Sequence, residues 1–270
     1  MTKIDLRFQK EVLSYYSTSG RYNLPWRKTK NPYRILVSEI MLQQTQVERV
    51  IPKYKAFIKT FPTVSSLAEA SLKDVLTLWQ GLGYNRRAKL LYQCAQAIVN
   101  NYGGKFPKTH EGLVALPGIG HYTAGAVMAF AYNEPVPIIE TNIRTVIIHH
   151  YFKTSDEVSD DEIMKVVTRT LPKDVCTWYA ALMDYGTHLK KTVGNVSRKS
   201  TLYTKQSTFK GSRRQLRGAI IRALTSGSHT KKSLLQNCIS FTPEQLKNEL
   251  VALEKEGLIT RSRSRYQLPS

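Results

Sequence analysis

The stretch "ALPGIGHYTAGAV", residues 115–127, is the sharpest local signal in the chain and decides its fold. Pro117 bends the backbone after a helix, and Gly118 and Gly120 permit positive φ angles and a close approach of other groups. A new helix is predicted directly after Gly120, and its exposed amides and positive dipole end suit a phosphate. A plain turn between helices would need the same glycines, so the rest of the chain decides between the two interpretations.

The chain is strongly basic. Its 270 residues include 40 Lys and Arg but only 20 Asp and Glu, a formal net charge of +20. A surplus of this size indicates a polyanionic partner, because neutralising phosphates releases condensed counterions. The turn is therefore predicted to be a helix-hairpin-helix motif that holds the nucleic-acid backbone rather than its bases. Its predicted contacts are Pro117, Gly118, Ile119, Gly120 and His121.

Bulk composition excludes several protein classes. Cys94, Cys176 and Cys238 lie too far apart for a disulfide framework or a thiolate metal cluster, and we expect them to be buried small apolar residues. No stretch is long and apolar enough for a bilayer, and "MTKIDLRFQKEV" lacks the apolar segment of a signal peptide. A cytoplasmic, nucleoid-associated protein with no membrane contact is predicted.

Helical periodicity runs through residues 1–190 without sustained two-residue alternation, which predicts an all-α first domain. Gly103-Gly104 is a predicted helix end, and Ser159 with Glu162 is a predicted helix start. Residues 191–211 are polar and basic, as in a linker or a strap. Between Asp184 and Glu244 no acidic residue occurs. We expect a stripe facing nucleic acid there, the alternative being a solvated linker. Its predicted contacts are Lys190, Lys191, Arg213 and Arg214, interleaved with Tyr203 and Phe209.

Residues 212–270 predict a small winged helix-turn-helix domain. Three helical segments are followed by "LITRSRSRYQL", which indicates two short strands around a basic turn. The third helix begins with Thr242, Pro243 and Gln245, a capping box with proline at the first helical position. That helix carries several glutamates, which suit a major groove poorly. The basic wing and the first helix are the expected phosphate contacts.

Several separate motifs together resemble the MutY-type adenine DNA glycosylases of the helix-hairpin-helix base-excision superfamily. They are "VSEIMLQQTQVERV" (37–50), "FPTVSSLAEASLKDVLTLWQGLGYNRRAKLL" (61–91), "YGGKFP" (102–107) and "LPGIGHYTAGAV" (116–127). The resemblance covers about residues 20–190 in consistent order. It implies two helical subdomains flanking a cleft, and a monomeric hydrolase of base excision repair. Its implied partner is double-stranded DNA in which adenine lies opposite 8-oxoguanine or guanine.

Removing a base from duplex DNA requires an acid to activate the base and a carboxylate to stabilise the developing sugar cation. The acid needs a raised pKa, which an apolar setting supplies. Glu39 has apolar sequence neighbours, and the resemblance implies that it is this general acid. The alternative is an ordinary glutamate on a helix surface.

The second implied carboxylate is Glu140 in "PIIETN", with Asn142 at the family's asparagine position. The family normally has aspartate there, and the extra methylene of Glu140 moves the oxygens by on the order of an ångström. A shifted backbone, slow activity or a different substrate could follow. A purely structural helix cap is the weaker interpretation, because glutamate caps poorly. We expect Glu39 and Glu140 to meet beside one everted nucleotide.

Tyr122 occupies the position where related strand-cutting enzymes carry a nucleophilic lysine. Tyrosine cannot form an imine, so water is the expected nucleophile and no lyase activity is expected. The resemblance also assigns Gln44 and Tyr84, with Thr45 and Leu82 beside them, to filling the gap left by the flipped base. A core aromatic at a helix junction is the alternative for Tyr84.

Two departures from the family stand out. The four cysteines that bind a four-iron cluster are missing, and Lys190 stands where the first would be. We therefore expect no iron–sulfur cofactor and no protein metal site, a monovalent cation at the hairpin being left open. The family's C-terminal domain, which inspects oxidised guanine, has no counterpart either, so the partner base stays open. Two alternative functions remain: a mismatch thymine or uracil glycosylase acting opposite guanine, and a lesion-binding protein with a weakened active site.

Overall fold

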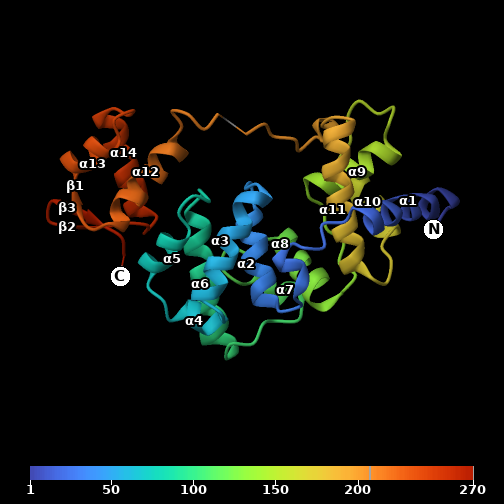
Figure 1. Ribbon diagram of the computed structural model, residues 1–270, viewed down its shortest axis with the longest axis horizontal. Helices are drawn as coiled ribbons and strands as arrows, with labels where there is room; N and C mark the ends of the chain where they lie inside the picture. Colours follow the sequence, from blue (N-terminus) through green and yellow to red (C-terminus); the bar gives the residue numbers. More distant parts are fainter. Residues whose placement is uncertain (207, 270) are drawn as a thin grey trace. The chain divides into compact units, whose positions relative to one another are not determined.

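The computed structural model describes residues 1–206 and 208–269, which are mostly helical, in agreement with the predicted all-α class (Figure 1). Position 207 of the predicted linker and position 270 of the predicted C-terminal domain lie outside the described residues. The chain forms two compact units from interleaved segments. The first unit holds residues 1–36, 107–115 and 119–205, and the second holds 37–106, 116–118 and 206–270. The predicted division into 1–190, 191–211 and 212–270 stays a prediction.

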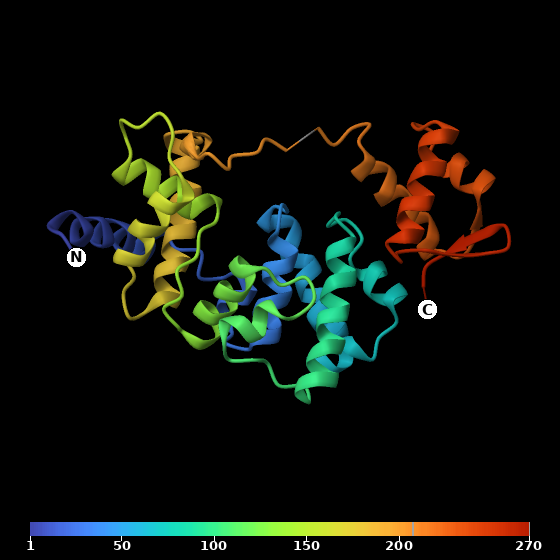
Figure 2. The ribbon, with the colours of Figure 1, turned by 180° about the vertical axis from the view of Figure 1, so that it is seen from behind.

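The first unit is built around α11 (Val175–Thr192). Its other elements are α1 (Lys3–Ser19), η1 (Pro25–Lys28), α7 (His110–Val114), α8 (His121–Val127), the π-helical turn η2 (Met128–Tyr132), α9 (Thr141–Tyr151), α10 (Asp160–Arg169) and η3 (Val196–Lys199). Helices α9 and α1 both pack against α11, and α9 lies beside it in both views (Figures 1 and 2). Trp178 and Tyr179 on α11 are fully buried in the core that these helices share.

A buried ion-pair cluster fixes the N-terminal segment onto α11. The Arg27 guanidinium donates to both oxygens of Asp184 at 2.6 and 2.8 Å, and Arg21 Nε donates at 2.6 Å. Burial opposes ionisation of Asp184, but the two arginines outweigh it and lower its pKa. Asp184 therefore serves the fold. The predicted start of α10 is also confirmed, because Ser159 and Glu162 form a capping box.

The second unit contains most of α2 (Pro32–Leu42), whose first turn belongs to the first unit. It continues with α3 (Val47–Thr60), α4 (Val64–Ala68), α5 (Leu72–Leu78) and α6 (Arg86–Tyr102). Helices α4 and α5 pack on α6. Gly103 ends α6 with a φ of 57°, as predicted, because glycine adopts the left-handed region without a Cβ clash.

The C-terminal part has the predicted three helices, α12 (Arg213–Thr225), α13 (Lys231–Asn237) and α14 (Pro243–Lys255), and the capping box of α14 is present. The predicted hairpin is formed by β2 (Thr260–Ser262) and β3 (Arg265–Gln267). An additional strand that was not predicted, β1 (His229–Thr230), pairs antiparallel with β3. A two-residue strand is too short to show an alternating pattern.

Cysteine burial corrects one expectation. Cys94 and Cys238 are buried as predicted, and burial raises the pKa of Cys94 to about 12. Cys176 is only partly buried, and its Sγ accepts a hydrogen bond from Lys30 Nζ at 2.9 Å. Among the described residues, no helix combines the length and the apolar character needed to cross a membrane.

Candidate active site

Glu140 is the N-cap of α9, where its carboxylate is held by three hydrogen bonds. Oε1 accepts from the backbone amides of Asn142 at 2.8 Å and Ile143 at 3.0 Å. Oε2 accepts from Asn142 Nδ2 at 3.2 Å. The expectation that glutamate caps poorly is wrong here, because an extended backbone at Glu140 lets the longer side chain reach the first amides of α9. Capping fixes the carboxylate and leaves a catalytic role open.

Asn142 lies between two charged groups. Its side-chain oxygen accepts a hydrogen bond of 2.8 Å from Lys190 Nζ, while its side-chain nitrogen donates to Glu140. Burial lowers the pKa of Lys190, and the nearby Glu140 carboxylate opposes that effect. Structure thus brings together Glu140 and Asn142, predicted to be catalytic, and Lys190, predicted to contact DNA. The DNA contacts of Lys190 and of the exposed Lys191 stay predictions.

The hairpin shows why glycine is needed at one of its two positions. Gly118 has a φ of 75°, and a Cβ there would lie 2.7 Å from Leu90 Cβ. Apart from its two chain neighbours, no atom of the described residues lies within 4 Å of a Cβ added at Gly120, so that position is open to an external group. His121, the first residue of α8, is exposed, and Tyr122 packs partly buried against the core of the first unit. Their predicted roles toward DNA stay predictions.

Glu39 lies on α2 with only 7% of its surface exposed. Its sequence neighbours Val37, Ile40 and Met41 are buried apolar residues. An ordinary surface glutamate is therefore excluded. The low exposure agrees with the environment that a proton-donating carboxyl group requires.

Both residues predicted to enter the DNA stack have unusual backbones. Gln44 has a φ of 52° and Tyr84 a φ of 47°. Both angles lie in the left-handed region, which residues other than glycine seldom adopt. Such strain is concentrated at functional loops, where it presents a side chain in a set direction. Thr45 connects the loop of Gln44 to the loop of Tyr84, because its hydroxyl donates a hydrogen bond of 3.4 Å to the carbonyl oxygen of Leu82. The four predicted wedge residues thus form one cluster in the second unit.

Arg87, which was not predicted to be a site residue, holds this cluster together. Its guanidinium donates to the carbonyl oxygens of Ile40 and Gln43, each at 2.6 Å, and at 3.3 Å to that of Leu82. Burial lowers the pKa of Arg87 to about 10. Arginine satisfies several carbonyls at once because its donors form a fixed fork. In the sequence, only the pair Arg86-Arg87 after a glycine-rich turn could have indicated the importance of Arg87.

We predict that Arg87→Met lowers the free energy of unfolding by about 2–4 kcal/mol, because several buried carbonyls lose their donor. Chemical denaturation monitored by circular dichroism would measure the loss. Arg86→Met is the matched control, since Arg86 is its exposed neighbour on α6. An equal effect of the two substitutions would contradict the role assigned to Arg87.

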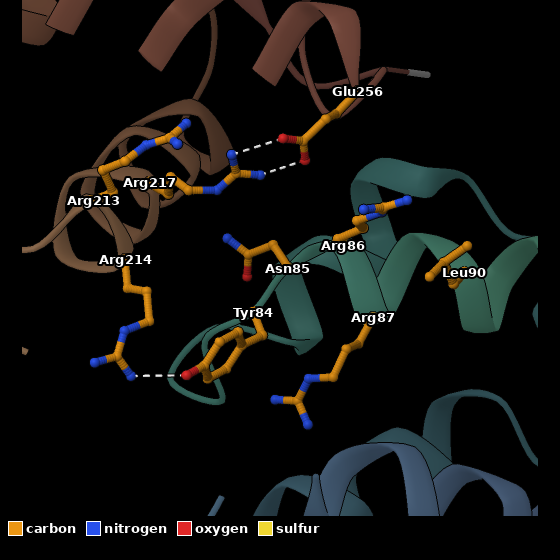
Figure 3. A pocket seen from close by; sticks show the side chains of 9 residues that line it. All are labelled: Tyr84, Asn85, Arg86, Arg87, Leu90, Arg213, Arg214, Arg217 and Glu256. Carbon is orange, nitrogen blue, oxygen red and sulfur yellow. Dashed lines mark hydrogen bonds and ion pairs between the residues drawn. The ribbon is translucent and has the colours of Figure 1, made fainter. Parts of the chain in front are cut away.

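A basic pocket of about 490 Å³ adjoins the wedge cluster within the second unit (Figure 3). It is lined by Tyr84, Asn85, Arg86, Arg87, Leu90, Arg213, Arg214, Arg217 and Glu256. Arg214 donates to the Tyr84 hydroxyl at 2.8 Å, and its guanidinium lies 5.5 Å from the ring centroid. Gln206 Nε2 approaches both the Tyr84 hydroxyl, at 2.5 Å, and Gln44 Oε1, at 3.3 Å. Arg213 and Arg217 form ion pairs with the buried Glu249.

Residues 187–200, where the resembling family carries its cluster cysteines, contain no cysteine, and the expected absence of an iron–sulfur cofactor stays a prediction. No group of three or more histidine, cysteine or acidic side chains suited to a metal occurs in the described part of the chain. The segment is held by hydrogen bonds instead. Val158 N donates to the Lys199 carbonyl at 2.9 Å, and Thr201 N donates to the Val158 carbonyl at 3.1 Å. Lys199 Nζ adds a bond of 2.8 Å to the Ser155 carbonyl.

Comparison with known proteins supports the predicted resemblance. The chain is 42% identical to an adenine DNA glycosylase of Buchnera aphidicola over 62% of its length and 46% of the relative. It is 43% identical to one of Mycolicibacterium smegmatis over 65% of its length and 61% of that protein. The chain thus spans about half the length of these relatives. The resemblance to adenine DNA glycosylases is confirmed.

Two solved structures share the fold. A thermostable thymine-DNA glycosylase matches with a TM-score of 0.63 and 27% identity, over 68% of this chain and 86% of the other. Endonuclease III in a trapped covalent complex with DNA matches with a TM-score of 0.58 and 20% identity, over 68% and 85%. The family described as HhH-GPD superfamily base excision DNA repair protein matches residues 37–173. Because that match spans half of the sequence, the chain belongs to the HhH-GPD superfamily of base excision DNA repair proteins.

Proposed function

We propose that the protein is a monofunctional DNA glycosylase that removes mispaired adenine, opposite 8-oxoguanine or guanine, and leaves an abasic site. The observation that carries this proposal is the Glu140 carboxylate, held by two α9 amides and by Asn142 within a segment similar to adenine DNA glycosylases. The protein would act as a monomer on double-stranded DNA in the nucleoid, without an iron–sulfur cluster.

In the proposed reaction, Glu39 donates its proton to N7 of the flipped adenine. The bond between C1′ and the base then breaks, and its electron pair leaves with the neutral base. Glu140 stays ionised and stabilises the cationic sugar. Water adds to C1′ and loses a proton, which gives the abasic sugar. Tyr122 packs near the sugar and offers no amine for an imine, so the strand stays intact.

A single-turnover panel tests the function. Duplexes that contain adenine, thymine or uracil opposite guanine or 8-oxoguanine are incubated with the protein, with and without alkali afterwards. Adenine should be released fastest, and strand breaks should appear only after alkali. Strand breaks without alkali would contradict the monofunctional assignment, and no release of any base would overturn the proposal.

A thymine or uracil glycosylase acting opposite guanine is the second candidate. The structural match to a thymine-DNA glycosylase favours it. Faster release of thymine or uracil than of adenine in the same panel would establish this function instead.

The basic pocket supports the proposed binding of DNA. Five arginines line it against one glutamate, and Arg214 lies against the wedge residue Tyr84. We predict that Arg214→Ala weakens binding to an undamaged duplex about 3–10-fold and reduces the salt-dependence slope by about 1. Fluorescence anisotropy over a range of salt concentrations measures both quantities. Arg222→Ala, at an exposed position on the same helix, is the control. Equal losses in the two variants would show that net charge alone matters.

A further inference from the structure

Lys190 reaches the Glu140 carboxylate through a single side chain. The ammonium group donates to Asn142 Oδ1 at 2.8 Å, and Asn142 Nδ2 donates to Glu140 Oε2 at 3.2 Å. An ammonium group only donates hydrogen bonds, so it selects the amide orientation in which the Asn142 oxygen faces Lys190. The Asn142 nitrogen must then face the carboxylate. The carboxylate only accepts hydrogen bonds, so Lys190 and Glu140 select the same orientation of the Asn142 amide and hold it from both ends.

A glycine on helix α11 allows the close packing that brings Lys190 to Asn142. A Cβ added at Gly186 would lie 2.4 Å from the Asn142 carbonyl oxygen and 2.7 Å from its Cβ. The backbone of α11 therefore packs directly against Asn142. Lys190 follows Gly186 by four residues, so both lie on the same face of the helix. Close packing at Gly186 brings α9 within reach of the Lys190 side chain.

Burial and charge indicate that this contact is specific. Lys190 is partly buried, whereas the next residue, Lys191, is exposed. Arg144 also interacts electrostatically with Glu140, but its guanidinium is bound by Asp160 at 2.6 and 2.8 Å. Burying a lysine costs free energy unless hydrogen bonds and an opposite charge compensate. Asn142 and Glu140 provide part of that compensation, although burial still lowers the pKa of Lys190.

We infer that Lys190 is a positioning residue that fixes the Asn142 amide and, through it, the Glu140 carboxylate for base excision. This inference rests on the proposed function. It also gives a role to the position at which the resemblance places the first cluster cysteine. Lys190 acts on the reaction through Asn142 and takes no covalent part in it.

Single-turnover excision and DNA binding separate this role from a simple DNA contact. We expect Lys190→Met to lower the excision rate about 10–100-fold, because a catalytic group displaced by about an ångström can lose this much. Its dissociation constant for a duplex with a non-cleavable adenine analogue should stay within about threefold, because the loss lies in the chemical step. Lys190→Arg keeps charge and donors and should restore most of the rate. Lys165→Met, at an exposed lysine on α10, should leave both quantities unchanged.

Three outcomes would overturn the inference. Weaker binding by Lys190→Met at an unchanged rate would make Lys190 a phosphate contact. A rate in Lys190→Arg as low as in Lys190→Met would exclude positioning through charge and donors. Borohydride trapping of the wild-type protein on DNA, lost in Lys190→Met, would identify Lys190 as a nucleophile.

A thermal double-mutant cycle tests the network without using activity. Lys190→Met and Glu140→Gln are compared singly and together by their unfolding midpoints. We expect the double variant to lose less than the sum of the single losses, because both remove the same network. Additive losses would overturn the inference. A wild-type protein that releases no base in the panel would refute the proposed function instead, while the cycle would still report on the network.

Discussion

Glu39→Gln is expected to reduce the single-turnover rate of adenine release by at least about 1000-fold, within the range ascribed to general acid catalysis. Glutamine has nearly the same shape as glutamic acid, so the buried position on α2 stays filled. Its amide cannot transfer a proton to the leaving base. Quenched-flow or manual time courses under enzyme excess would measure the rate.

Binding and stability show whether this loss is chemical. The affinity of Glu39→Gln for a mismatched duplex and its unfolding midpoint should stay close to the wild-type values. Glu48→Gln, at an exposed position on α3, is the control for loss of one carboxyl group. If Glu39→Gln lost binding and stability along with activity, Glu39 would be a structural residue and the assignment of the acid would be wrong.

Periodicity and caps predicted most of the helical fold. Ser159 with Glu162, Thr242 with Gln245, and Gly103 marked the helix ends that the structure shows, because each signal lies within one turn of sequence. The strand β1 escaped prediction because its pairing with β3 joins residues far apart along the chain. The interleaving of the two units was not predicted either, because each unit is built from segments far apart along the chain.

Motifs located the candidate site residues but not the contacts that hold them. The resemblance placed Glu39, Glu140 and Asn142, whereas Arg87 and Lys190 emerged as organising residues only from three-dimensional contacts. Arg87 binds carbonyls more than 40 residues away in sequence, and Lys190 binds an amide 48 residues away. Every residue has a backbone carbonyl, so the sequence does not show which of them accept a hydrogen bond from a side chain. A buried arginine or lysine therefore looks like any other basic residue in a chain with 40 of them.

Capping of α9 needs only an acceptor oxygen at Glu140, whereas the proposed catalytic role needs its negative charge. Glu140→Gln keeps the oxygen and removes the charge, so it distinguishes the two roles. Glu140→Gln should lower the excision rate about 100–1000-fold, because removing one preorganised group that stabilises transition-state charge typically costs this much. The glutamine oxygen can still accept from the amides of Asn142 and Ile143, so part of the cap survives. Single-turnover excision and thermal unfolding, measured on the same preparation, provide both numbers.

Glu140→Ala completes the argument by removing the cap and the charge together. Loss of a helix cap typically costs about 0.5–2 kcal/mol, so this variant should unfold at a lower temperature than Glu140→Gln. Its excision rate should nevertheless be about as low, because both variants lack the carboxylate. If the rate instead followed stability, with Glu140→Gln nearly active and Glu140→Ala inactive, the hydrogen bonds of Glu140 to α9 would be its contribution to activity. The developing sugar cation would then have to be stabilised by another group.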